Sequence, residues 1–309
     1  MTSNAEDIVN PQIEEMRTVE ESQFTRKHDI NPLIERSRLP GETVRLPSCG
    51  IFYTNGELAE HVTDGEIHIY PMTALDEIVI SSASKLFSGE GIIEVIQRCI
   101  PDIINPEQLL AQDIDYIMLC LRKISYGSIF EFKFTHEACT HFIELAKNSE
   151  SDEPIDESLL LPRDNIYQID MNSMIAKTKE LSVNDITSTY RVELDNLMII
   201  KMQPVRFDSY VKLMQLITTS SDKIKTDEER KNLILDQIAS MILSVDEIVD
   251  SKLIRDWLEV ITPQQVRTIN EAVSNMASWG IDTSLKINCQ DCGTEMEVDL
   301  PASPLALFS

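Results

Sequence analysis

The sequence contains few of the features on which membrane-spanning and secreted proteins depend. Only nine glycines and six cysteines occur among its 309 residues. The sequence contains no run of about 18 apolar residues, which is the length a helix needs to cross a membrane. The first 15 residues are polar and acidic, without the apolar stretch of a secretory signal. We therefore expect a soluble protein made in a reducing cytoplasm, in which the cysteines do not form a disulfide scaffold.

The signatures of common catalytic sites are also missing. The sequence has no G-x-x-x-x-G-K phosphate loop, no G-x-S-x-G nucleophile turn and no H-E-x-x-H metal motif. The order His136, Glu137, Ala138, Cys139 only superficially resembles a zinc deaminase motif, because the Cys pair lies about 150 residues away. We expect no enzymatic activity and no small-molecule substrate.

Positive charge is scarce. Lys and Arg number 27 against 52 Asp and Glu, which gives a net charge of −25. The densest group of cations, Arg36, Arg38 and Arg45, is interrupted by acids, so a nucleic-acid backbone would be repelled. The acidity favours either contacts with partners of complementary charge or plain solubility.

The most informative stretch is the segment 287–300, INCQDCGTEMEVDL. Cys289 and Cys292 are separated by two residues, Gly293 follows where the chain must turn back, and short alternating segments flank the turn. The pattern predicts a strand, a ligand-bearing turn and a second strand. A tetrahedral zinc ion needs four ligands and one such turn supplies two, so the chain should hold a second turn.

A second pair of candidate ligands at the same spacing occurs at His136 and Cys139. Phe alternates with charged residues over 130–134, which predicts a strand running into His136. We predict a zinc site of His136, Cys139, Cys289 and Cys292, with His141 as a substitute for His136. Two alternatives stay open. In the first, the cysteines are ordinary thiols and His136 is a surface residue. In the second, the Cys pair serves redox chemistry, which the strand that follows the pair disfavours.

Length and pattern together predict an α+β protein that carries a large insertion. We expect a small antiparallel β element with short helices and a split zinc-ribbon-like module, interrupted by a mainly helical segment. The predicted parts are an N-terminal arm (1–40), an α+β core with the first turn (41–146), a mainly helical insertion with a hairpin (147–285), and the second turn with a C-terminal tail (286–309). The acidic, proline-containing stretch 147–165 marks the start of the insertion.

Several individual elements are specified by local signals. Thr73 begins a helix with a capping-box pattern, and a further helix begins near Asp113 and ends before Gly127. A hairpin about residues 195–196 is followed by a helix over 227–243 and by one capped at Thr262. The apolar tail residues Leu305, Leu307 and Phe308 either contact a partner or pack on the same chain.

The order of several stretches resembles a known family. LPSCGIFYTNG, GEIHIYPMTALDEIVISSASKLFSGEGIIEVIQRCIP and DIDYIMLCLRKISYG, followed by the strand into the first turn, are similar to the baseplate hub protein family of T4-like contractile-tailed bacteriophages. The resemblance covers about residues 45–144 and resumes at INCQDCGTEMEVDLP. Where such proteins carry two Cys-x-x-Cys turns, His136 stands in the first cysteine position here, and imidazole is also a good zinc ligand.

The resemblance implies a structural or assembly component of the central tail baseplate, located in the virion and assembled in the host cytoplasm. Its expected partners are other baseplate hub, tube or tape-measure proteins. We expect it to bind neither nucleic acid nor a membrane. One alternative is a non-virion assembly factor or chaperone for hub or tape-measure proteins. A second is a zinc-ribbon regulator that binds nucleic acid, which the net charge of −25 disfavours.

Overall fold

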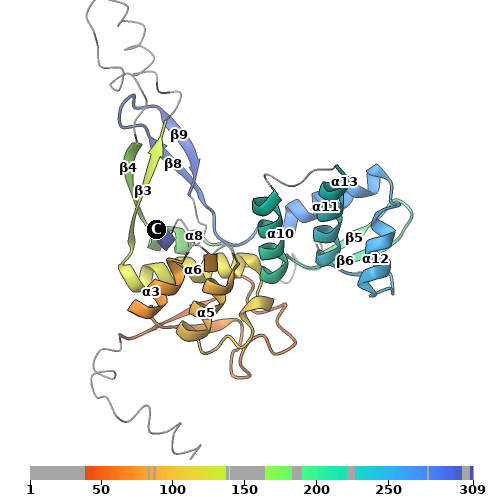
Figure 1. The fold of residues 1–309 in the computed structure, drawn as a ribbon, viewed down its shortest axis with the longest axis horizontal. Coiled ribbons are helices and arrows are strands. Elements are labelled where there is room, and N and C mark those ends of the chain that lie inside the picture. The colour runs from red at the N-terminus through yellow and green to blue at the C-terminus, as the bar shows by residue number, and fades with distance from the viewer. Residues whose placement is uncertain are drawn as a thin grey trace, which may run out of the picture. The chain divides into compact units, whose positions relative to one another are not determined.

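The computed structural model describes residues 39–82, 84–85, 88–136, 139, 164–182, 190–220, 227–276, 278–300 and 307–308 (Figure 1). The segment 41–309 forms one compact unit. Almost all of the predicted N-terminal arm lies outside the described residues, as do His141 and Leu305. The fold contains small antiparallel sheets together with helices, so the predicted α+β class is confirmed.

A first hydrophobic cluster gathers the elements that precede the first ligand-bearing turn. Strands β1 (Glu42–Arg45) and β2 (Glu66–Ile69) pair antiparallel, and helices α3 (Ala74–Ile80), α5 (Glu90–Cys99) and α6 (Ala111–Tyr126), with the short 3-10 helix η1 (Pro106–Gln108), complete this part. Apolar residues at helical spacing on α6, Ile114, Ile117 and Leu121, are almost fully buried. Truncating Leu121 to Ala should therefore cost about 2–5 kcal/mol.

Local signals set the ends of these helices. Thr73 caps α3 through a reciprocal capping box with Asp76, as predicted. Gly127 ends α6 at a positive φ of 95°, a conformation that suits glycine. The predicted start of α6 near Asp113 is two residues late, because Leu110 is the N-cap and Asp113 lies buried in the first turn.

Two hairpins carry the ligand-bearing turns. Strands β3 (Ile129–Thr135) and β4 (Asp164–Asp170) form one, and β8 (Ser284–Asn288) and β9 (Glu295–Asp299) form the other. Phe130 and Phe132 of β3 and Val298 of β9 point into the first hydrophobic cluster, where helix α8 (Met171–Lys177) also packs. Figure 1 shows the two hairpins side by side, and a hydrogen bond from Asn165 of β4 to Asp291 joins them.

A second hydrophobic cluster lies around a three-stranded sheet. Its strands are β5 (Arg191–Glu193), β6 (Ile199–Met202) and β7 (Ile242–Val245), in the order β5-β6-β7. Helices α11 (Asp227–Met241), α12 (Ser251–Leu258) and α13 (Pro263–Met276) contribute to this cluster, whereas α10 (Phe207–Ser220), between β6 and α11, places its buried Phe207 in the first cluster. Ile200, Ile254 and Ile269 are among the most deeply buried residues of the second cluster.

Buried polar groups join chain segments that belong to different parts of the sequence. Asp113 of α6 is fully buried and accepts hydrogen bonds from the backbone N–H of Ser48 and the hydroxyl of Tyr53. The Tyr53 hydroxyl in turn accepts from the N–H of Leu110 at 2.9 Å. Burial raises the pKa of the Asp113 carboxyl to about 6, against the opposing effect of its hydrogen bonds.

A buried ion pair lies in the same region. Arg206 Nη1 is 3.2 Å from Glu57 Oε1, and the side chains are only 16% and 4% exposed. The guanidinium also donates to the carbonyl oxygens of Gln108 and Phe52, and Glu57 Oε2 accepts from the N–H of Asn55. We refer to this ion pair and the Asp113 group together as the polar junction.

The predicted hairpin about residues 195–196 is confirmed by the pairing of β5 with β6. The helix predicted over 227–243 ends at Met241, because Ile242–Val245 pair with β6 instead. Strand β4 was not predicted either.

Leu307 is buried and Phe308 packs against Tyr126, so these two tail residues contact their own chain. The predicted domain boundaries stay a prediction, and no helix in the described part has the length and apolarity of a membrane span.

Candidate metal centre

The first ligand-bearing turn follows directly from β3. The alternation of buried Phe130 and Phe132 with exposed Glu131 and Lys133 fixes which face of the strand packs inward. The strand ends at Thr135, and the N–H of Cys139 then donates to the carbonyl oxygen of His136 at 3.1 Å. This tight turn carries the imidazole and the Cys139 thiol.

The second turn joins β8 to β9 and is closed by two backbone hydrogen bonds. The N–H of Gly293 donates to the carbonyl oxygen of Cys289 at 2.8 Å. The N–H of Cys289 donates to the carbonyl oxygen of Thr294 at 2.9 Å. Gly293 has a φ of 74°, and a Cβ placed there would meet no atom within 4 Å. The turn therefore requires glycine for its backbone conformation and not for lack of space.

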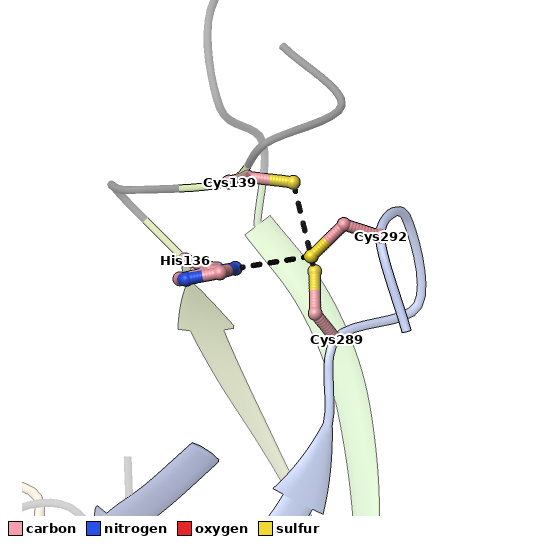
Figure 2. Close-up of side chains that lie close together, drawn as sticks. All are labelled: His136, Cys139, Cys289 and Cys292. Atoms are coloured by element: carbon pink, nitrogen blue, oxygen red, sulfur yellow. Dashed lines mark hydrogen bonds between the residues drawn. The ribbon is translucent and has the colours of Figure 1, made fainter. Parts of the chain in front are cut away.

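The two turns bring the four predicted ligands together (Figure 2). His136 lies at the end of β3, and Cys289 and Cys292 lie on the loop after β8. The sulfurs of Cys139 and Cys289 are 3.8 Å apart, and the Cys292 sulfur is 3.5 Å from His136 Nδ1. All four ligand atoms lie within 4.8 Å of one another.

The cluster has a buried half and a more accessible half. Cys139 and Cys289 are 1% and 2% exposed, while His136 and Cys292 are half-buried. The pKa of the Cys292 thiol is lowered to about 5, first by its hydrogen bond with the Thr294 side chain at 3.2 Å and then by the Thr294 backbone. A thiol of lowered pKa is present as thiolate near neutral pH, and the thiolate is the form that binds metals.

Strand β4 supports the second turn from the side. Asn165 is buried and donates from Nδ2 to Asp291 Oδ2 at 2.8 Å, and Gln290 Nε2 donates to the carbonyl oxygen of Ile166 at 2.7 Å. Both contacts hold residues that lie between the two cysteines. Sequence reasoning missed these supporting residues because each one bonds to a residue more than 120 positions away in the chain. It missed Thr294 because that residue is not one of the ligands that the spacing indicates.

This arrangement can hold a metal ion. Three thiols and one imidazole that converge from two turns form a donor set that suits a tetrahedral ion. In the part of the chain that the structure describes, it is the one group of three or more His, Cys, Asp or Glu side chains with convergent ligand atoms.

Comparison with known proteins assigns the chain to a family. The comparisons with curated proteins and with solved structures gave no match. The family described as T4 bacteriophage base plate protein matches residues 57–303. The match covers well over half of the sequence, including both strands of each hairpin and all four clustered ligands. The chain therefore belongs to the family of T4 bacteriophage base plate proteins.

Proposed function

We propose that His136, Cys139, Cys289 and Cys292 bind one zinc ion that stabilises the fold. All four residues lie within the matched range 57–303. The observation that supports the proposal is the convergence of their ligand atoms within 4.8 Å from two turns. A closed set of four protein ligands leaves no position for a substrate, so the zinc would be structural.

A zinc ion at this position would link two turns that are far apart in the sequence. Cys139 and Cys289 are separated by 150 residues, so the link would constrain a large part of the unfolded chain. Because the unfolded chain lacks a preformed site, much of the binding free energy would become folding free energy.

Metal analysis of purified variants tests this proposal. The wild type should contain one zinc per chain, and Cys289→Ser and His136→Ala should both lose zinc and melt at a lower temperature. Cys49→Ser is the matched control, because Cys49 is a half-buried cysteine outside the cluster. Zinc lost only in Cys289→Ser would break the pairing of the two turns, and a wild type without zinc would overturn the site.

We further propose that the chain acts in the central hub of the phage baseplate, through protein–protein contacts with other hub, tube or tape-measure proteins. Family membership over residues 57–303 carries the baseplate part of this proposal. The order of stretches between residues 45 and 144, which is similar to hub proteins, supports the hub part.

The composition of phage particles tests the hub proposal. Purified tails and baseplate intermediates from infected cells should both contain the chain, at the centre of the baseplate when labelled for electron microscopy. A chain present in intermediates and absent from mature tails would instead be an assembly factor. A chain found in neither would overturn the proposal.

A further inference from the structure

One end of the three-stranded sheet exposes several large apolar side chains. Leu197 lies in the turn between β5 and β6 and is 76% exposed. Val249 and Ile248, between β7 and α12, are 73% and 48% exposed. We call these three residues the sheet-end surface.

Hydrogen bonds hold these segments close together in the fold. The N–H of Asp246 donates to the carbonyl oxygen of Ile199 at 2.7 Å, and the N–H of Ile199 donates back to Asp246 Oδ1 at 2.8 Å. This pair joins the segment after β7 to the turn that carries Leu197. On the other side of that turn, Gln265 of α13 donates to Asp195 at 2.9 Å. The turn is thus connected to both neighbouring segments.

Leu197 has a backbone conformation that its side chain does not explain. Its φ is 65°, in the left-handed region that costs a residue with a Cβ about 1–2 kcal/mol and suits Gly or Asn. Asp246 has a similar φ of 51°, but its carboxylate accepts a hydrogen bond there. Leu197 buries little of its side chain within its own chain, and the turn itself holds its conformation: the N–H of Leu197 donates to the carbonyl oxygen of Leu194 at 2.9 Å, and the N–H of Leu194 donates to the carbonyl oxygen of Met198 at 2.9 Å. The turn therefore explains the conformation but does not require an apolar side chain at this position.

The segments of the sheet-end surface are rich in acidic groups. Four exposed carboxylates lie in the same segments: Asp195, Asp246, Glu247 and Asp250. Of the two cations between residues 246 and 260, Arg255 pairs with Asp236 and Glu259, which leaves Lys252. The border of the apolar surface is therefore negative.

We propose that the sheet-end surface is the docking site for another baseplate protein, whose apolar patch is bordered by Lys and Arg. Such a partner would bury Leu197 and Val249 while its cations face the carboxylates, a complementarity that favours specific association. A second copy of this chain would place like charges opposite each other, and nucleic acid or an anionic membrane would be repelled for the same reason. This inference rests on the proposed function in the baseplate.

Two substitutions separate docking from folding. Leu197→Asn removes the apolar side chain and introduces a residue that tolerates the left-handed conformation, so the melting temperature should stay equal or rise. Glu247→Lys reverses one border charge without touching the capping residue Asp250. The matched control is Ile78→Asn, because Ile78 is 69% exposed on α3, in a different part of the fold.

The full-length variants are expressed during infection by a phage whose own copy of the gene is inactivated, and the chain is quantified in purified baseplates. Leu197→Asn and Glu247→Lys should each lower incorporation by about tenfold or more, as expected for a central contact residue and its border. Ile78→Asn should be incorporated like the wild type. Equal incorporation of all three would overturn the docking site, whereas absence of the wild-type chain from all baseplate material would overturn the proposed function and the docking site with it.

A photocrosslinker placed at position 197 of the full chain identifies the occupant. Crosslinks to an apolar surface of another baseplate protein with Lys and Arg around it support the proposal. Crosslinks only to a second copy of this chain, or to nothing, overturn it.

Discussion

Two links in this protein join residues that are almost equally far apart in the sequence, by different chemistry. The metal cluster brings Cys139 and Cys289 together across 150 residues, and the ion pair of the polar junction brings Glu57 and Arg206 together across 149. The junction completes its bonds with groups of its own chain. The cluster consists of donor groups that suit an ion supplied from outside.

The difference decides what each link responds to. Glu57 and Asp113 of the junction are buried, so loss of their partners leaves charges or polar atoms unpaired inside the protein. The cluster instead consists of ligand groups, two of them half-buried (His136 and Cys292), whose bonds an ion from the solvent would complete. We expect the first link to respond to mutation and pH, and the second to metal supply.

The largest expected effect is that of removing the metal. A strong chelator should lower the free energy of unfolding of the zinc-loaded protein by several kcal/mol, because structural zinc contributes directly to folding. Thermal unfolding with and without the chelator measures this, and adding zinc back should restore the melting temperature. Cys289→Ser protein is the control, because it should be insensitive to chelator. An unchanged wild-type melting temperature would show that the cluster does not stabilise the fold through a metal.

Breaking the buried ion pair comes next in size. Arg206→Met should cost about 3–5 kcal/mol, because it leaves Glu57 charged and buried without its partner. Neutralising that carboxylate as well, in Arg206→Met with Glu57→Gln, should recover part of the loss. Denaturant unfolding of both variants measures the difference, and a single variant that loses less than about 1 kcal/mol would show that the pair behaves like a surface ion pair.

The metal cluster was accessible from the sequence because its signals are local. Each turn carries two ligands at fixed spacing, and Gly293 marks the reversal of the chain, so ligand spacing alone groups the four residues. The fold brings them within 4.8 Å of one another. That they bind zinc stays a prediction. The capping box of Thr73 and the hairpin of β5 and β6 were predictable for the same reason.

The polar junction was not accessible, because its partners are specified only by the folded chain. Asp113 lies near the start of a helix, where an acid is favourable on local grounds, and nothing nearby indicates that it faces Tyr53, 60 residues away. Strands β4 and β7 were missed for a related reason. The acidic stretch before β4 favours a loop, and Ile242 continues the helical apolar spacing of α11, so only pairing with β3 and β6 defines them as strands.

Replacing Asp113 tests the pH response of the junction. The carboxyl has a pKa of about 6 in the folded chain and about 3.9 when unfolded. The folded chain therefore binds more protons between these values, and the free energy of unfolding falls as pH rises through them. The loss is on the order of 3 kcal/mol, complete above about pH 7.

The measurement is the difference in unfolding free energy between the wild type and Asp113→Asn from pH 4 to pH 7.5. Asn cannot ionise, so the wild type should lose stability relative to the variant as pH rises. Any pH dependence of metal binding is common to both proteins and cancels. A difference that stays constant over this range would show that Asp113 ionises in the folded chain as easily as in the unfolded one.

The smallest expected effect concerns the turn that carries Cys289 and Cys292. Gly293→Ala should cost about 1–2 kcal/mol through its left-handed backbone, with no steric contact to add to it. Gly56→Ala is a matched control, because Gly56 has a φ of 81° and equally open surroundings. Both should lower the melting temperature by similar amounts, but only Gly293→Ala should weaken zinc binding in a competition titration, since its turn positions two ligands. Equal zinc affinity in the two variants would mean that the cluster tolerates a distorted turn. The bound metal would then determine the geometry of this loop more than the loop determines the affinity for the metal.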